Sequence, residues 1–428
     1  MNSKLIAGLG GALALAMLGG CMVNETKPLP KINAVQAEAE IPEGERLDVG
    51  VRAFDPGIPQ ELANDEEKLA KKRIYPEIRG AESRFMATML RSTLESSGQW
   101  GAVRVVPEGA EFVDVVVTGK IVQSTGAQLA LDVSVSDSTG RMWIENKRYE
   151  SVADIGSYKT DAALKARDPF QNVYSMIAND MVAVRDELLA DQRREIRRVT
   201  ELRFASDLAP DAMQGYLDKD GKGFLKAARL PADNDPISDR IERIRERDAG
   251  VIDTVDGYYA NFAEQIRDSY GGWRRTSQEE IEKEDRLRNQ ARTRTILGAA
   301  AVLAAVFVPG QCQAYDYNCR RLENATRTAG TLGGTAAVLS GLKKFSDARV
   351  AAQAVKELAQ SFQAEVAPQV VDVEGRTLRL TGSAEEQYRE WRKLLRQLYL
   401  EETGGVPAPA ATTPTAAPLP TAGSSASD

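Results

Sequence analysis

The chain has 428 residues, a formal net charge of −7, three cysteines and no histidine. A mildly acidic protein is a poor general binder of nucleic acid, and a chain without histidine cannot form Ser-His-Asp or Cys-His nucleophile systems. The length is sufficient for two or three domains.

The first twenty residues have the pattern of a secretory leader. Lys4 gives a positive start, residues 5–17 form an apolar run, and Leu18-Gly19-Gly20-Cys21 follows. This ending resembles the bacterial lipobox, in which the cysteine is acylated and becomes the new amino terminus. An uncleaved membrane anchor is the alternative, although the apolar run is short for a span. We therefore expect residues 1–20 to be a signal peptide and Cys21 to carry a covalent lipid.

The residue after the cysteine bears on location. Several acyl chains anchor a protein stably, whereas a single chain binds a membrane only marginally. Lipoproteins of this kind are retained in the inner membrane by Asp at the second position, where this chain has Met22. The resemblance thus implies the periplasmic face of the outer membrane, with no cofactor other than the lipid on Cys21.

Two cysteines remain, Cys312 and Cys319, and they lie close together in the sequence. In an oxidising compartment we expect them to form a disulfide that closes the loop 313–318. A zinc half-site is the alternative, but zinc sites need further cysteine or histidine ligands, which this chain lacks. We expect no metal site.

Residues 21–45 mix Pro, Lys, Glu and Ala without a period, which predicts a flexible tether. Residues 46–153 predict an α/β domain with the order β-α-β-β-β-β, because short alternating or valine-rich runs follow one helical pattern. The expected strands are 47–54, 102–107, 112–123, 128–137 and 142–151, and the expected helix is about 76–96.

Four phrases of this domain carry a resemblance. They are Leu94-Glu95-Ser96-Ser97-Gly98-Gln99-Trp100 at the helix end, Val103-Arg104-Val105-Val106-Pro107, Val115-Val116-Val117-Thr118-Gly119-Lys120-Ile121, and the turn Asp137-Ser138-Thr139-Gly140. Together they resemble the periplasmic domain of curli-secretion channel lipoproteins and the amino-terminal domain of the TolB family. The resemblance covers residues 46–153 and implies the fold of this domain, while one fold can host many functions.

Residues 165–295 predict a mostly helical region. Val173, Ile177 and Met181 recur at helical spacing, and the helix can continue through Arg198. Asp218-Lys219-Asp220-Gly221-Lys222-Gly223 hints at a calcium loop, but basic residues stand where acidic ligands are needed, so a solvated turn is the better interpretation.

Residues 296–342 predict an apolar helical hairpin around the expected disulfide loop. Gly330/Gly334 and Ala337/Gly341 have the small-xxx-small spacing that lets helices approach closely. One interpretation is a buried helix pair in the helical region. The other is membrane contact or insertion, although thirteen apolar residues reach only about 20 Å of a hydrocarbon core of about 30 Å. The residues expected to contact the membrane are Ile296, Leu297, Val302, Leu303, Val306, Phe307, Leu332, Val338 and Leu339.

Residues 346–403 predict a helix, a β-hairpin over 370–381 and a last helix. Ser383 and Glu386 have the spacing of a capping box at the start of that helix. Residues 404–428 are rich in Pro, Ala, Thr and Ser, which predicts a disordered tail. The fold class expected for the whole chain is α+β.

The sequence favours a non-catalytic role. It contains neither a Walker A phosphate loop nor a Gly-x-Gly-x-x-Gly motif at a helix start, and acidic pairs such as Glu279/Glu280 are typical of solvated helix faces. We expect an outer-membrane lipoprotein that is a structural or assembly component of an envelope complex, as a homo-oligomer or ring or with other envelope proteins. The alternatives are a pore or transport-channel subunit formed by the hairpin and a periplasmic regulator of a cell-wall synthase.

Overall fold

A computed structural model describes residues 30–232, 235–307, 369–373, 376–380 and 383–403. The chain divides into two compact units, one of Met1–Lys31 and Asp154–Pro169 and one of Ile32–Ala153 and Phe170–Asp428. The described part of the smaller unit holds the 3-10 helix η3 (Ile155–Tyr158) and the short helix α4 (Asp161–Ala166). The sheet, the helices that pack on it and the carboxy-terminal elements all belong to the larger unit.

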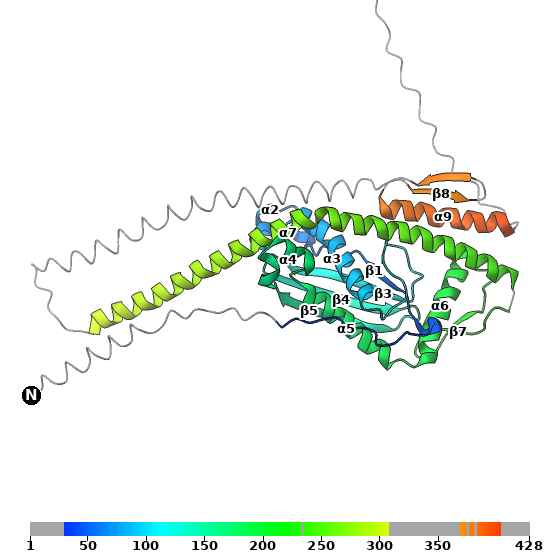
Figure 1. Ribbon diagram of the computed structural model, residues 1–428, viewed down its shortest axis with the longest axis horizontal. Coiled ribbons are helices and arrows are strands. Elements are labelled where there is room, and N and C mark those ends of the chain that lie inside the picture. The colour runs from blue at the N-terminus through cyan, green and yellow to red at the C-terminus, as the bar shows by residue number, and fades with distance from the viewer. Residues whose placement is uncertain (1–29, 233–234, 308–368, 374–375, 381–382, 404–428) are drawn as a thin grey trace, which may run out of the picture. The chain divides into compact units, whose positions relative to one another are not determined.

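The larger unit is built on a five-stranded mixed sheet with the strand order β2-β1-β3-β4-β5 (Figure 1). β1 (Val49–Arg52) is parallel to β2 (Val103–Val106) and to β3 (Val115–Ser124). β4 (Gln128–Asp137) and β5 (Met142–Val152) continue from β3 as an antiparallel meander. The α+β class and the β-α-β-β-β-β order expected from the sequence are confirmed.

Helix α3 (Pro76–Ser96) connects β1 to β2 and has the bounds that the sequence predicts. Pro76 is suited to the first helical position because it lacks the N–H that would have no partner there. The face with Ile78, Phe85 and Leu90 is buried, as are Val49 and Val51 of the interior strand β1. Shorter elements around this layer are η1 (Glu43–Glu45), η2 (Gln60–Leu62) and α2 (Glu66–Lys71).

The helical region begins with two helices, not one that continues through Arg198. α5 (Gln171–Glu187) ends before Leu188, whose backbone is extended, and α6 (Ala190–Leu208) starts anew with the Gln192 side chain accepting the Leu189 N–H at 2.9 Å. A small hairpin follows, β6 (Leu217–Lys219) and β7 (Leu225–Ala227), at the place where the sequence indicates a solvated turn.

Helix α7 runs without a break from Pro236 to Phe307, which is 72 residues. Its residues Asp253 and Asp256 cover the open edge of the sheet, since the Asp256 carboxylate accepts the N–H of Val105 in the edge strand at 2.7 Å and Asp253 pairs with Arg104. A covered edge cannot pair with another chain. In the part of the chain that the structure describes, no helix combines the length and apolar character needed to cross a membrane.

The carboxy-terminal elements are the hairpin β8 (Gln369–Val373) and β9 (Arg376–Leu380) and the helix α9 (Ala384–Thr403). The predicted capping box is confirmed, because the Glu386 carboxylate accepts the Ser383 N–H at 2.8 Å and the Ser383 hydroxyl accepts the Glu386 N–H at 3.2 Å. The expected helical hairpin stays a prediction, because residues 308–342 lie outside the described residues. Residues 296–307 are the end of α7.

The predicted tether differs from a free linker in its second half. Residues 32–46, which we call the strap, lie along α5 and α6 and make hydrogen bonds with them. The side chains that hold the strap are Asn172, Asn179, Arg193, Arg194 and Arg197. The sequence pattern of the strap alone could not indicate this, because its partners come more than a hundred residues later.

Candidate functional site

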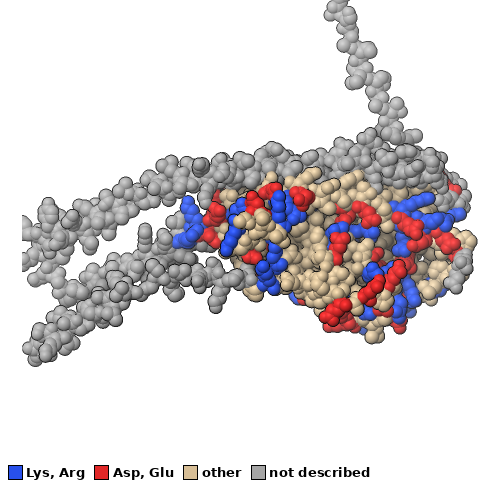
Figure 2. Space-filling model, in the orientation of Figure 1, with Lys and Arg blue, Asp and Glu red and all other residues tan. Residues whose placement is uncertain are grey.

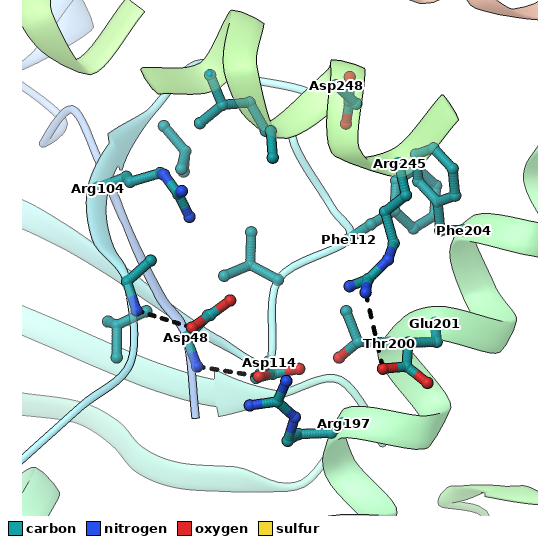
Figure 3. Close-up of a pocket in the computed structure, with 16 residues that line it drawn as sticks. Asp48, Arg104, Phe112, Asp114, Arg197, Thr200, Glu201, Phe204, Arg245 and Asp248 are labelled. Carbon is teal, nitrogen blue, oxygen red and sulfur yellow. Dashed lines mark hydrogen bonds and ion pairs between the residues drawn. The ribbon is translucent and has the colours of Figure 1, made fainter. Parts of the chain in front are cut away.

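A polar pocket of about 80 Å³ lies between the amino-terminal edge of the parallel strands and helices α6 and α7 (Figure 3). Charged side chains from several elements converge on it. They are Asp48, Arg104, Asp114, Arg197, Glu201, Arg245 and Asp248.

Two aspartates form the base of this pocket. Asp48 directly precedes β1 and Asp114 directly precedes β3, and parallel strands bring these two starts together. The Asp114 carboxylate accepts the backbone N–H of Asp48 at 2.9 Å, and the Asp48 carboxylate accepts the N–H of Ala102 at 2.7 Å. Gly101 leaves room for this contact, since a Cβ there would lie 2.1 Å from Asp48 Oδ1. The two carboxylates thus hold the starts of three strands together.

The arginines of the pocket each have a partner within the protein. Arg245 of α7 pairs with Glu242 at 2.7 Å and lies 3.9 Å from Glu201 of α6. Arg197 donates to the backbone carbonyl oxygens of Glu43 and Arg46 in the strap. These arginines therefore join the sheet, the strap and the helices, and removing one partner of such a contact would leave a polar group without its partner.

Burial raises the pKa of Asp114 to about 6 from its ordinary value of 3.8, although hydrogen bonds from Thr200 and from the Asp48 N–H oppose the shift. The folded protein therefore holds this proton to a higher pH than the unfolded chain. The protonated Asp114 carboxyl contributes most to stability below the unfolded pKa near 4, and this contribution is lost as the pH rises to about 6. A shift of two units corresponds to about 3 kcal/mol.

Asp114→Asn is expected to remove the loss of stability that the titration of Asp114 causes between about pH 4 and pH 6. The amide oxygen can still accept the Asp48 N–H, so the variant should gain about 1–2 kcal/mol of unfolding free energy at pH 7 and almost none at pH 4. Urea unfolding of both proteins at pH 4, 5, 6 and 7 checks this. Asp248 is common to both proteins, so the difference between them isolates Asp114. Parallel pH profiles for the two proteins would show that Asp114 titrates normally.

Asp248 connects the pocket to α9. Its carboxylate accepts the indole N–H of Trp391 at 3.1 Å and the hydroxyl of Tyr388 at 3.4 Å. Burial raises the pKa of Asp248 to about 6, against the opposing charge of Arg392. Arg392 also pairs with Asp207 of α6 at 2.5 Å. These contacts hold α9 against α6 and the first part of α7.

No protein-family model, curated protein or solved structure matches this chain. The resemblance to curli-channel and TolB-type domains accordingly stays a prediction.

The residues that line the pocket include none of the lipid, disulfide, membrane-contact or helix-packing residues expected from the sequence. Ile296, Leu297, Val302, Leu303, Val306 and Phe307 belong to the last turns of α7, about 70–90 Å along the helix from the Asp248 level at 1.5 Å per residue. The others lie outside the described residues: Cys21, Cys312, Cys319, Gly330, Leu332, Gly334, Ala337, Val338, Leu339 and Gly341. The one signal that could have found the pocket is an aspartate directly before each of two valine-rich strands.

The surface of the described residues has no dominant sign on the face shown in Figure 2. Lys and Arg side chains are interspersed with Asp and Glu side chains across it. Within the described part of the chain, no group of three or more acidic or cysteine side chains is placed to hold a metal ion. The features that distinguish the molecule are thus its ion-paired junction, the strap and the long helix α7.

Proposed function

We propose that this chain is an exported, lipid-anchored protein of the outer membrane. In this proposal it acts without catalysis, as a structural or assembly component of an envelope complex. The observation that carries the proposal is the course of α7. One helix forms part of the core with its first half and carries an apolar end beyond the sheet with its second half (Figure 1).

The first part of α7 is packed into the fold. Ile244, Tyr259 and Tyr270 are buried, and Gln278 is the last buried residue among the side chains of α7 that the structure describes. Another 29 residues, 279–307, complete the helix, and at 1.5 Å per residue they extend about 43 Å. A continuous helix of this length supports a role in which the protein presents the end of α7 to another component of the envelope complex.

The chain also comes back to the fold after α7. The hydroxyl of Tyr259 bonds to the carboxylate of Glu385 at 2.5 Å, and Asp248 bonds to Trp391, so α9 is fixed to the first half of α7. The chain between Phe307 and α9 therefore begins at the far end of α7 and ends on the fold. A long helix whose first part is fixed to the fold in this way suits a structural arm.

The mass of the protein in detergent tests this proposal. The full-length protein is extracted from membranes in a mild detergent, and its protein mass is measured by light scattering. We expect a mass well above that of one chain, 46.6 kDa, either as a multiple of it or with a co-purifying envelope protein in a fixed ratio. A single chain without a stoichiometric partner would contradict an assembly role.

A further inference from the structure

The strap fixes the amino-terminal chain along the fold from Ile32 onward. The Ile32 N–H donates to Asn172 at 3.0 Å, and the Val35 N–H donates to Asn179 at 2.8 Å, so the strap follows α5. At its other end, Glu45 pairs with both Arg193 and Arg194 of α6, at 2.6 and 2.8 Å. The Glu45 carboxyl has a lowered pKa because of the hydrogen bond from Arg193.

The strap begins at the end of the fold from which α7 leaves. Asn172 is two residues after Phe170, and the guanidinium of Arg274, near the last buried turn of α7, lies 5.8 Å from the Phe170 ring centroid. The strap finishes beside Arg197, which lines the same pocket as Arg245 near the start of α7. From Glu45 back to Ile32, the strap therefore runs in the same direction as α7 runs from Arg245 to Arg274.

The segment from Cys21 to the strap is no longer than the part of α7 that follows Arg274. Cys21 to Lys31 is eleven residues, and an extended chain spans at most 3.3–3.6 Å per residue, or about 40 Å. From Arg274 to Phe307, α7 continues for another 33 residues, or about 50 Å. The greatest distance from the start of the strap to a lipid on Cys21, about 40 Å, is therefore shorter than the part of α7 after Arg274, about 50 Å.

We propose that the end of α7, residues 296–307, inserts into the same membrane leaflet that holds the lipid on Cys21. This inference rests on the proposed lipid anchor. The stretch Ile296–Phe307 consists only of apolar and small residues and is about 18 Å long, which exceeds half of a hydrocarbon core of about 30 Å. A tilted helix end of this length is buried within one leaflet.

The residues before this stretch suit a membrane surface. Arg286, Arg288, Arg292 and Arg294 all fall within the three turns of α7 that precede Ile296. Arginine near the headgroup level attracts anionic lipids, and its stem can lie along apolar surface while its charge stays in water. Two attachments, one through the lipid and one through α7, would both keep the folded unit that contains the strap and α7 at the membrane surface.

Vesicle binding tests the insertion without the lipid. Full-length mature protein with Cys21→Ser is mixed with vesicles of phosphatidylethanolamine and phosphatidylglycerol and sedimented. We expect binding that falls at least tenfold in Val302→Asp/Val306→Asp, since charges are costly in the hydrocarbon region. The control is Ala260→Asp/Asn261→Asp, which adds the same charge at two exposed positions of the same helix. The control should bind like the parent, and circular dichroism should show all three proteins folded.

Three results would overturn the proposal. The parent could fail to bind vesicles, or the two charged variants could lose binding equally. The Val302→Asp/Val306→Asp variant could instead keep vesicle binding while losing self-association, which would assign the end of α7 to a second copy. Vesicle binding by the Cys21→Ser proteins depends neither on lipidation nor on the mass in detergent, so failure of this proposal is distinguishable from failure of the proposed function.

A second measurement tests the choice of membrane. Wild-type lipidated protein is reconstituted into one vesicle population, and a second, protein-free population with a fluorescent lipid is added. Insertion into the same leaflet predicts that no labelled vesicles are captured. Capture that is lost in Val302→Asp/Val306→Asp would show that α7 reaches a different membrane, contrary to the proposal.

Discussion

Trp391→Ala is expected to lower the free energy of unfolding by about 3–5 kcal/mol, the usual cost of removing a large aromatic side chain from a core. Trp391 is fully buried, in a cluster with Val106, Phe204 and Leu395 that joins the sheet, α6, α7 and α9. The substitution also takes the indole N–H away from the buried carboxylate of Asp248, which leaves that group with fewer donors. Urea unfolding at pH 7, followed by circular dichroism, measures the effect.

Trp391→Phe serves as the matched control. It keeps most of the ring volume but removes the N–H, so its cost should be that of the hydrogen bond plus a small volume loss, about 1–3 kcal/mol. The difference between the unfolding free energies of the two variants then reports the packing of the aromatic ring at position 391. If Trp391→Ala changed the unfolding free energy by less than about 1 kcal/mol, α9 would not belong to the core of the fold.

Gly126→Ala is expected to destabilise the junction between the sheet and α7 by about 3 kcal/mol or more, since the overpacked contact involves backbone atoms that cannot rotate away. Gly126 lies in the turn between β3 and β4. A Cβ there would be 1.9 Å from the Arg274 carbonyl oxygen and 2.5 Å from the Gln278 nitrogen of α7. The Gly126 N–H also donates to the Ser277 hydroxyl at 3.3 Å. Thermal and urea unfolding of the purified variant measure the loss.

Gly257→Ala is the control for Gly126→Ala. Gly257 lies on α7, the helix that Gly126 approaches, and no atom comes within 4 Å of a Cβ built there. Alanine is favoured over glycine inside a helix by about 1 kcal/mol, so this variant should be as stable as the wild type or slightly more stable. Equal stability of both alanine variants would show that the turn and α7 are not in close contact.

The regular elements of the α/β domain could be predicted because their cause is local. The bounds of α3 and β4 agree with the prediction, since apolar residues recur at helical spacing in one and alternate in the other. The capping box of α9 was recognisable for the same reason, as Ser383 and Glu386 are three residues apart. The α+β class follows from these elements.

The candidate site could not be predicted, because its contacts join distant parts of the sequence. Asp48 and Asp114 are 66 residues apart, and Glu45 reaches arginines almost 150 residues later. An aspartate before a strand or a glutamate in a proline-containing segment is equally compatible with a solvated surface. The continuity of α7 was missed for a different reason, because a change from charged to apolar composition at residue 296 suggests a boundary that the helical backbone does not have.

The most direct test of the account is the mass of the mature amino-terminal peptide. Wild-type protein is extracted from the membranes of the producing bacterium, digested and analysed by mass spectrometry. We expect a peptide that begins at Cys21 and carries acyl chains, with no peptide from residues 1–20. An unmodified Cys21, or a peptide that continues unbroken from residue 20 into residue 21, would contradict it.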